Sequence, residues 1–198
     1  MYSGAQFSIH AMSDDFIDVI LGGVNALGTS NDLRIETDDI STLVTGSPRR
    51  VFQAMESAYG ESCRRGGHVV LQAHISRGCP GEPDEPLCTP AADGGTGGAS
   101  GERIDVAGVP RTGIPVRAQY SLYPLGIPDY MDVIADEIAA AKVAGVFDRS
   151  KHFCSKLHGD LSHVMAHVYN SFERAADRAG HVVIQLTISK GSPSEVRS

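Results

Sequence analysis

The chain has 198 residues, a formal net charge of -7, 41% hydrophobic residues and 21% charged residues. This composition is typical of a globular protein, and it excludes both a disordered chain and an apolar run long enough to span a membrane. The Lys and Arg residues are scattered, so we expect no nucleic-acid partner. No secretory signal is visible in the sequence, and we expect a cytoplasmic protein.

The first eighty residues follow the order strand, helix, strand, strand, helix, strand. Residues 5–11 alternate apolar and polar side chains, which predicts a half-buried strand, and apolar residues then recur at helical spacing. Residues 33–46 are typical of two short strands around a tight turn. Ser47 and Pro48 predict the start of a second helix, and residues 68–76 form the last predicted strand.

The same order returns after a stretch that is rich in Gly, Pro, Asp and Ala. Residues 81–115 show no apolar periodicity and predict a linker or extended loop, with poor order around residues 93–100. We therefore divide the chain into a first repeat (1–80), this linker, and a second repeat (116–198). Within the second repeat we expect a strand at 116–123, a helix at 128–144, a hairpin at 146–157, a helix at 160–179 and a strand at 181–189.

Residues 67–80 recur almost unchanged at residues 180–193. The segments GHVVLQAHISRGCP and GHVVIQLTISKGSP are identical at nine of fourteen positions, at an offset of 113. Each repeat has the element order of a ferredoxin-like unit, an α+β fold with a four-stranded antiparallel sheet and both helices on one face. The other sheet face must be covered, either by packing one sheet against the other or by forming a dimer, and we expect a homodimer.

A hydroxyl group recurs at the same place in the third strand of both repeats. Thr42 follows Ile40 by two residues, and Ser155 follows Phe153 by two residues, so each hydroxyl interrupts an inward-facing apolar row. A buried hydroxyl without a partner costs about 1 to 3 kcal/mol, so it must bond to a neighbouring carbonyl group, to water or to a ligand. We expect a pocket between sheet and helices beside each hydroxyl.

The end of the first strand borders the same expected pocket in each repeat. The residues concerned are Ser8, Ile9 and His10 in the first repeat and Ser121, Leu122 and Tyr123 in the second. Asp15 and Asp129 recur at the start of the first helix of each repeat. Each carboxylate either complements the helix N-terminus or provides a counter-charge for a cationic ligand at the pocket mouth.

Patterns for other kinds of chemistry are weak. His163 and His167 have a spacing that can bind zinc, but the glutamate of the HExxH motif is missing, and we interpret them as part of a solvated helix face. There is no nucleophile elbow, phosphate-binding loop or dinucleotide fingerprint, so we predict no catalytic residue, no metal and no cofactor. The four cysteines lack CxxC spacing and are interpreted as free thiols: Cys63, Cys79, Cys88 and Cys154.

Several short motifs together resemble one known family. The strand Phe-Ser-Ile-His or Tyr-Ser-Leu-Tyr-Pro is followed by Asp-Phe-Ile or Pro-Asp-Tyr-Met, then by Asp-Asp-Ile-Ser-Thr and Gly-Cys-Pro-Gly. This pattern resembles the YkoF family of proteins that bind thiamin and hydroxymethylpyrimidine (HMP), over residues 5–193 apart from the linker. The resemblance implies a non-enzymatic homodimer that binds thiamin or HMP once per repeat. It also implies a role in uptake or salvage of the vitamin, with components of a thiamin-precursor ABC transporter as partners.

The chemistry of these ligands suggests roles for the candidate residues. Thr42 or Ser155, with backbone groups of the first strand, would hold the aminopyrimidine ring. The thiazolium cation of thiamin would lie near Tyr123, Asp15 and Asp129. The first repeat has His10-Ala11 where the family has Tyr-Pro, so we predict that the two sites are unequal.

Two other classes of function remain open at this point. One is a regulatory small-molecule sensor of the ACT type, which has the same element order. The other is an enzyme on a dimeric ferredoxin-like scaffold, which needs an acid–base or metal constellation that the sequence does not reveal. Thermal-shift screening of amino acids against thiamin would separate the sensor from a vitamin-binding protein.

Overall fold

The structure is a computed structural model that describes residues 3–28, 31–78 and 101–194. The first repeat contains β1 (Ser3–Ala11), α1 (Phe16–Asn25), β2 (Leu33–Thr37), β3 (Thr42–Gly46), α2 (Pro48–Arg65) and β4 (Val69–Arg77). A short 3-10 helix, η2 (Val106–Gly108), precedes the second repeat. The second repeat contains β5 (Pro115–Leu125), α3 (Tyr130–Val143), β6 (Phe147–Ser150), β7 (Ser155–Asp160), α4 (Leu161–Ala176) and β8 (His181–Lys190). The predicted order βαββαβ therefore occurs twice.

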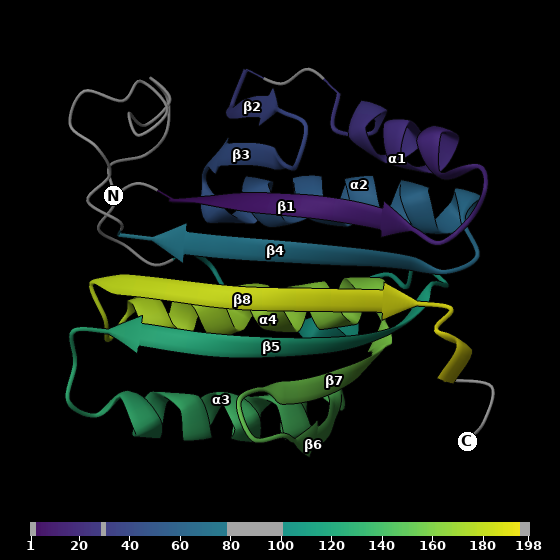
Figure 1. Cartoon of the computed structure of the whole chain (residues 1–198). Coiled ribbons are helices and arrows are strands. Elements are labelled where there is room, and N and C mark those ends of the chain that lie inside the picture. Colours follow the sequence, from purple (N-terminus) through teal and green to yellow (C-terminus); the bar gives the residue numbers. More distant parts are fainter. Residues whose placement is uncertain (1–2, 29–30, 79–100, 195–198) are drawn as a thin grey trace.

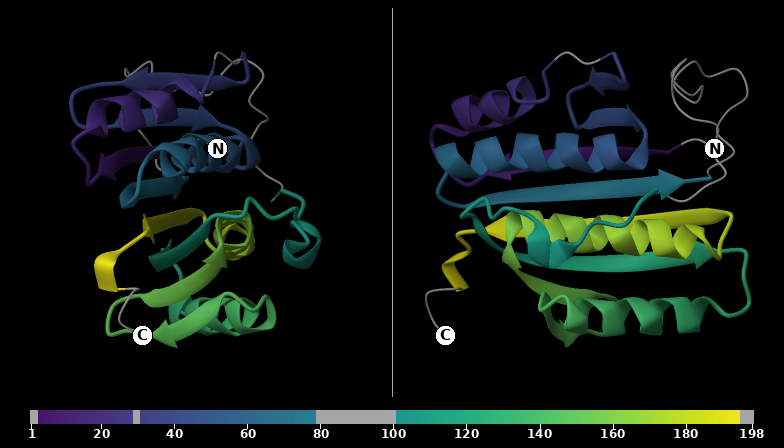
Figure 2. Two further views of the ribbon diagram at one scale, coloured as in Figure 1. Left: turned by 90° about the vertical axis from the view of Figure 1, so that its right-hand side faces the viewer. Right: turned by 180° about the vertical axis from the view of Figure 1, so that it is seen from behind.

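Within the described residues, strands β1 to β8 form one continuous antiparallel sheet in the order β2-β3-β1-β4-β8-β5-β7-β6. Helices α1 to α4 lie on one face of this sheet, with α2 and α4 behind its centre and α1 and α3 further out (Figures 1 and 2). The tandem ferredoxin-like architecture is confirmed. One of the two alternatives, packing of one sheet against the other within the chain, is wrong. The repeats instead join edge to edge through β4 and β8.

The period-two alternation of each strand separates a buried face from an open one. On β4 the side chains of Val69, Leu71 and Ile75 are buried under the helices, whereas Gln72 and His74 are exposed on the opposite face. β8 repeats this pattern with buried aliphatic residues opposite Gln185 and Thr187. The open face of the sheet is therefore largely polar, and it does not present the apolar surface that motivated the expected homodimer.

The repeated fourteen-residue segment forms the seam between the two repeats. β4 and β8 pair from Val69 opposite Lys190 to Arg77 opposite Val182. At one end the His68 ring lies 3.4 Å from the Ser189 hydroxyl, and at the other end the His181 ring lies 3.4 Å from the Ser76 hydroxyl. These contacts are equivalent at the offset of 113, so the seam has approximate two-fold symmetry.

Two long side chains extend from the seam strands to a helix of the opposite repeat. Lys190 donates hydrogen bonds to the carbonyl oxygens of Cys63 (3.1 Å) and Gly66 (2.8 Å), at the end of α2. A cation there complements the partial negative charge of a helix C-terminus. Its counterpart Arg77 forms an ion pair of 3.1 Å with Glu173 on α4, and Glu173 is fully buried.

Residues 101–114, called the strap below, lie along the outer side of α4 (Figure 2, right). The Asn170 side chain pairs with the backbone of Ile104 through bonds of 2.7 and 2.8 Å, and the Tyr169 hydroxyl donates to the carbonyl of Glu102. The second part of the predicted linker is thus packed against the second repeat. The predicted poor order at residues 93–100 lies outside the described residues.

The tips of the two hairpins differ from the sequence-based expectation. Ile40 and Phe153 were expected to face inward, but they lie in the turns before β3 and β7 and are 79% and 91% exposed. The row of inward-facing side chains begins two residues later, at Thr42 and Ser155, which are both buried as expected. None of the helices in the described part of the chain is long and apolar enough to cross a membrane.

Candidate ligand-binding site

The second repeat contains a hollow of about 600 Å³ between its sheet and α3, called the inner hollow below. Its walls are residues 120–127 of β5 and the following turn, one side of α3, and residues 150–155 between β6 and β7. Most of these residues are apolar or aromatic: Tyr120, Leu122, Tyr123, Pro124, Leu125, Ile127, Tyr130, Met131, Ile134, Ile138 and Phe153. The volume lies within the range of about 300 to 1,000 Å³ that is usual for sites that bind small molecules.

One carboxyl group, that of Glu137 on α3, lies in the wall of the inner hollow. Glu137 is only 3% exposed, and Arg174 on α4 donates two hydrogen bonds to it, at 2.8 and 2.6 Å. The Ser171 hydroxyl donates a third bond of 2.6 Å to the same carboxylate, and the His167 ring lies 3.3 Å from that hydroxyl. A two-pronged Arg–carboxylate contact fixes the orientation of the carboxylate plane.

The surroundings set the charges of this polar cluster. Burial, with a smaller effect of Arg174, lowers the pKa of His167 to about 4, so its ring is neutral at neutral pH. Burial raises the pKa of Tyr120 to about 12, so its phenol stays protonated. The hydrogen bonds to Glu137 raise the pKa of Arg174, which stays positively charged. The cluster therefore offers a ligand one oriented carboxylate whose charge is balanced by Arg174.

Four of the residues predicted from the second repeat line the inner hollow. Ser121, Leu122 and Tyr123 come from β5, and Ser155 comes from the start of β7. Leu122 and Ser155 are buried, whereas Tyr123 is 44% exposed at the edge. The Ser121 hydroxyl donates a 2.8 Å bond to the carbonyl of Phe153 and so fixes the turn that closes the hollow on one side.

The fifth predicted residue of the second repeat, Asp129, lies outside the walls of the inner hollow. It precedes α3 and forms an ion pair with Arg178, which lowers the pKa of its carboxyl group. Its side chain makes no capping hydrogen bond to the helix. Asp129 is thus held by Arg178 in this structure.

The predicted residues of the first repeat occupy equivalent positions with different contacts. Ser8 donates a 2.7 Å bond to the carbonyl of Ile40, and the Thr42 hydroxyl lies 3.0 Å from that of Thr37. Ile9 is buried against the helices, whereas His10 is exposed on the open face at the end of β1. Asp15 precedes α1, is exposed and makes no capping hydrogen bond.

The polar cluster around Glu137 has no counterpart in the first repeat. In the first helix the repeats are offset by 114 residues, as Asp15 and Asp129 are, and Gly23 occupies the position of Glu137. At the offset of 113, Ala54, Ala58 and Glu61 occupy the positions of His167, Ser171 and Arg174. A Cβ atom added at Gly23 would lie 2.1 Å from the Ser62 hydroxyl oxygen, so α1 lies directly against α2. The space that Glu137 and its partners occupy in the second repeat is therefore closed in the first.

Sequence reasoning missed Glu137, Ser171 and Arg174, and it misinterpreted His167. His167 is 1% exposed, so the predicted solvated helix face is wrong at this position, because the ring packs against Tyr120 of the sheet and the Ser171 hydroxyl. His163 is bonded to the carbonyl of Val109 in the strap at 3.0 Å. A comparison of the two repeats finds residues that recur. It could not find this cluster, because its members differ between the repeats.

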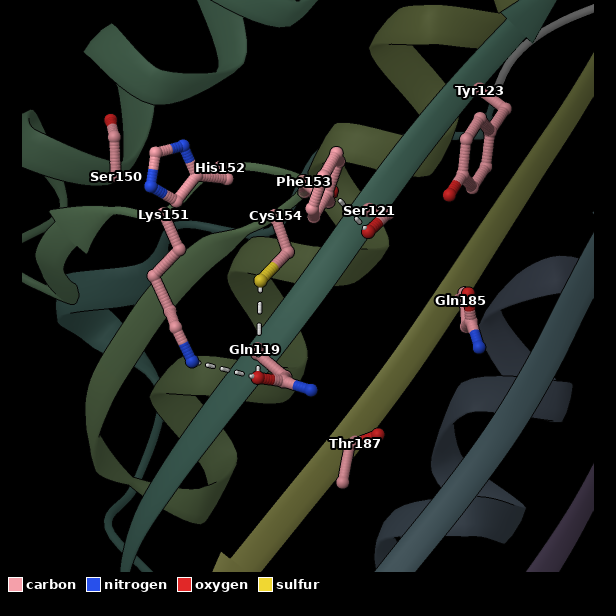
Figure 3. A pocket seen from close by; sticks show the side chains of 10 residues that line it. All are labelled: Gln119, Ser121, Tyr123, Ser150, Lys151, His152, Phe153, Cys154, Gln185 and Thr187. Carbon is pink, nitrogen blue, oxygen red and sulfur yellow. Dashed lines mark hydrogen bonds between the residues drawn. The ribbon is translucent and has the colours of Figure 1, made fainter.

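A second hollow of about 750 Å³, called the outer hollow below, lies on the open face of the sheet (Figure 3). It is bounded by Gln119, Ser121 and Tyr123 of β5, residues 150–154, and Gln185 and Thr187 of β8. In Figure 3 the Lys151 and Cys154 side chains both point toward Gln119, whose amide oxygen lies 3.4 Å from the Lys151 amine and 3.8 Å from the Cys154 sulfur.

The described cysteines carry free thiols, as predicted for Cys63 and Cys154. Cys79 and Cys88 lie outside the described residues. Burial raises the pKa of Cys63 to about 11, so this thiol is protonated and unreactive at neutral pH. Within residues 3–28, 31–78 and 101–194, no three His, Cys, Asp or Glu side chains are grouped so that they could hold a metal ion.

Comparison with known proteins agrees with the duplicated architecture. The family model described as "YKOF-related Family" matches residues 2–82 and again residues 115–195. The chain belongs to the YKOF-related family. It is 32% identical over 192 residues to the "Putative HMP/thiamine-binding protein YkoF" of Bacillus subtilis (strain 168), which covers 97% of this chain and 92% of that protein. Membership of the YKOF-related family supports a binding role in general.

Proposed function

We propose that the protein binds thiamin or HMP in the inner hollow without catalysing a reaction on it. The observation that carries this proposal is the oriented carboxylate of Glu137 in the wall of a hollow whose other wall residues are mostly apolar or aromatic. The name of the B. subtilis relative supports the same ligand class. The function serves uptake or salvage of the thiamin precursor, with transporter components as candidate partners.

The chemistry of an aminopyrimidine matches this wall. Its flat ring can stack against Tyr120, Tyr123 or Tyr130 and exclude water from the apolar wall of α3. Its amino group is a hydrogen-bond donor, and Glu137 is an acceptor that still has a free lone pair on the oxygen bonded by Arg174 Nε alone. A buried acceptor of this kind selects a ring that donates at that position.

We also propose a second, weaker site in the first repeat. The buried Thr42 hydroxyl and Ile9 keep the positions of their counterparts, but Gly23 brings α1 against α2. A ligand there has less room and lacks the carboxylate of Glu137. Two unequal sites follow from this difference, and the homodimer remains a proposal beside them.

Isothermal titration calorimetry with thiamin and HMP tests the proposal. We expect binding well below millimolar ligand, and we expect Glu137→Gln to weaken it by roughly ten- to a hundredfold, because a charged hydrogen bond is worth about 1.5 to 3 kcal/mol. Asp136→Asn is the matched control, since Asp136 is a 72% exposed neighbour on α3 that is paired with Arg178. No heat with either ligand at millimolar concentration would reject the proposal.

A further inference from the structure

The turns between the two hairpin strands have opposite charges in the two repeats. At the offset of 113, Lys151 and His152 of the second repeat replace Asp38 and Asp39 of the first. The same inversion continues at the preceding strand position, where Arg149 replaces Glu36. The inversion places a basic turn beside the hollows of the second repeat, in a chain whose formal net charge is -7.

This basic turn is a wall that the inner and outer hollows share. Ser121, Tyr123 and residues 150–154 line both hollows, so the two spaces meet at the point where β7 begins and the edge of β5 is no longer paired. A ligand whose ring lies in the inner hollow therefore has the 150–154 turn beside its solvent-facing end. Figure 3 shows the Lys151 side chain of this turn in the outer hollow, where its amine points toward Gln119 of β5.

The charge of Lys151 is available to a ligand. Its hydrogen-bond partner is the uncharged amide oxygen of Gln119 at 3.4 Å, and among the described residues it takes part in no ion pair. Lys156 on the same sheet face differs, since Asp148 neutralises it at 2.9 Å. The acidic group in the walls of the inner hollow, Glu137, is already balanced by Arg174. Among the residues that line the two hollows, Lys151 is therefore the charged side chain whose charge no described ion pair balances.

In the first repeat the corresponding turn carries two carboxylate side chains, those of Asp38 and Asp39. The Asp38 carboxylate accepts backbone N–H bonds from Ile40 (2.8 Å) and Ser41 (2.7 Å), and these bonds lower its pKa. Asp39 beside it is exposed. An acidic turn repels an anionic ligand and favours a cationic one, so the two repeats present opposite fields to the same class of ligand.

We infer that the second-repeat site selects an aminopyrimidine ligand that carries a phosphate ester, and that Lys151 and His152 bind the phosphate. This inference rests on the proposed function and adds the charge of the ligand to it. A phosphate monoester has a charge of about -1.5 to -2 at neutral pH, and lysine binds it as a point charge. The thiazolium of unphosphorylated thiamin has the opposite sign and gains nothing from this turn.

Calorimetry of the full chain with thiamin monophosphate, thiamin and inorganic phosphate tests the inference. In about 50 mM salt we expect thiamin monophosphate to bind the stronger site about five- to tenfold more tightly than thiamin, and we expect about 500 mM salt to abolish this preference. Inorganic phosphate should bind far more weakly than the ester. If it binds as tightly as the ester, the turn is a site for free phosphate, and the inference is wrong.

Variants test whether the preference for thiamin monophosphate over thiamin comes from the 150–154 turn. Lys151→Gln should bring the affinity ratio of the two thiamin forms close to one, and Lys151→Asp combined with His152→Asp should reverse it. Lys156→Gln, which removes a lysine that Asp148 already neutralises, should keep the preference. If thiamin binds but the phosphate adds nothing, this inference fails and the proposed function stands. If neither form binds, both fail.

Discussion

At the scale of single residues, Glu137 and its partners are the feature that makes the second repeat different. Arg174 and Ser171 hold the carboxylate, and the neutral His167 ring contacts Ser171 from the other side. A buried carboxylate next to Arg is costly to separate from its partner, because either charge left unpaired inside the protein is poorly solvated. The cluster therefore behaves as one unit, and its charge state matters for stability as well as for binding.

His167 makes this unit sensitive to acid. Its pKa is lowered from 6.5 to about 4 in the folded chain, so between these values the unfolded chain binds a proton that the folded chain does not. The free energy of unfolding therefore falls as the pH drops through this window, by roughly 2 kcal/mol at about pH 5. The Tyr120 ring lies edge-on to the His167 ring, and the charge of Arg174 adds a smaller part to the lowered pKa of His167.

Urea unfolding of the protein and of His167→Gln at about pH 7 and pH 5 measures this contribution. Glutamine can still bond to Ser171 but does not titrate, so the variant should lose less stability between the two pH values than the natural chain. The difference should be roughly 2 kcal/mol. An equal loss in both proteins would show that His167 is not the group responsible.

At the scale of elements, α2 and α4 begin at equivalent positions but are capped differently. Ser47 precedes α2 and makes no capping hydrogen bond with its side chain. Asp160 precedes α4 and accepts bonds from the backbone N–H groups of Ser162 (3.1 Å), Thr112 (2.9 Å) and Gly113 (2.8 Å). The same carboxylate thus caps the helix and fastens the end of the strap.

The two capping positions predict unequal costs of substitution. Asp160→Ala should lower the free energy of unfolding by about 2 kcal/mol, at the upper end for a helix cap, because strap contacts are lost with it. Ser47→Ala should change it by less than about 0.5 kcal/mol. Thermal or urea unfolding of the two variants checks the contrast, and equal costs would mean that Asp160 does not hold the strap.

The contribution of Asp160 should also depend on pH. Partial burial tends to raise the pKa of its carboxyl group, but hydrogen bonds from Thr112 and Ser162 outweigh it and lower the pKa to about 2. A lowered pKa means that the stabilisation is present above the ordinary value of 3.8 and is lost as the pH falls toward 2. The stability gap between the natural chain and Asp160→Ala should therefore narrow in acid.

At the scale of the whole molecule, the seam of β4 and β8 converts two units into one sheet. The turn that follows β4 passes close to the start of β8, and the turn that follows β8 passes close to the start of β4. A Cβ atom at Gly78 would lie 2.0 Å from the carbonyl oxygen of Gly180, and one at Gly191 would lie 2.1 Å from that of Gly67. The glycines of the repeated segment therefore allow the two chain segments to approach each other.

The variants Gly78→Ala and Gly126→Ala distinguish the energetic cost of a steric clash from the cost of backbone strain. Both glycines have a positive φ, of 83° and 79°, so alanine costs about 1 to 2 kcal/mol at either position. Only Gly78→Ala also forces a backbone clash, which should add at least about 1 kcal/mol. Unfolding should remain a single transition in both variants, and equal destabilisation would show that the seam has room at Gly78.

Much of the architecture was predictable from the sequence because it depends on local patterns. Alternation along residues 5–11 and 68–76 identifies strands, and the repeat at the offset of 113 identifies two equivalent units. The same alternation places Thr42 and Ser155 inside and Gln72 on the open face, since side-chain direction in a strand has a period of two. Ser121, Leu122, Tyr123 and Ser155 were predicted to border a pocket in this way, and they line the inner hollow.

The edge-to-edge joining of the repeats and the composition of the inner hollow depended on tertiary structure. Strand pairing between β4 and β8 is a contact between distant segments that no local pattern specifies. The position of α3 away from α4, with Glu137 between them, results from side-chain volume, because Gly23 allows α1 to lie against α2 in the other repeat. Sequence periodicity determined which side chains face inward; only packing in three dimensions decided where space for a ligand remains.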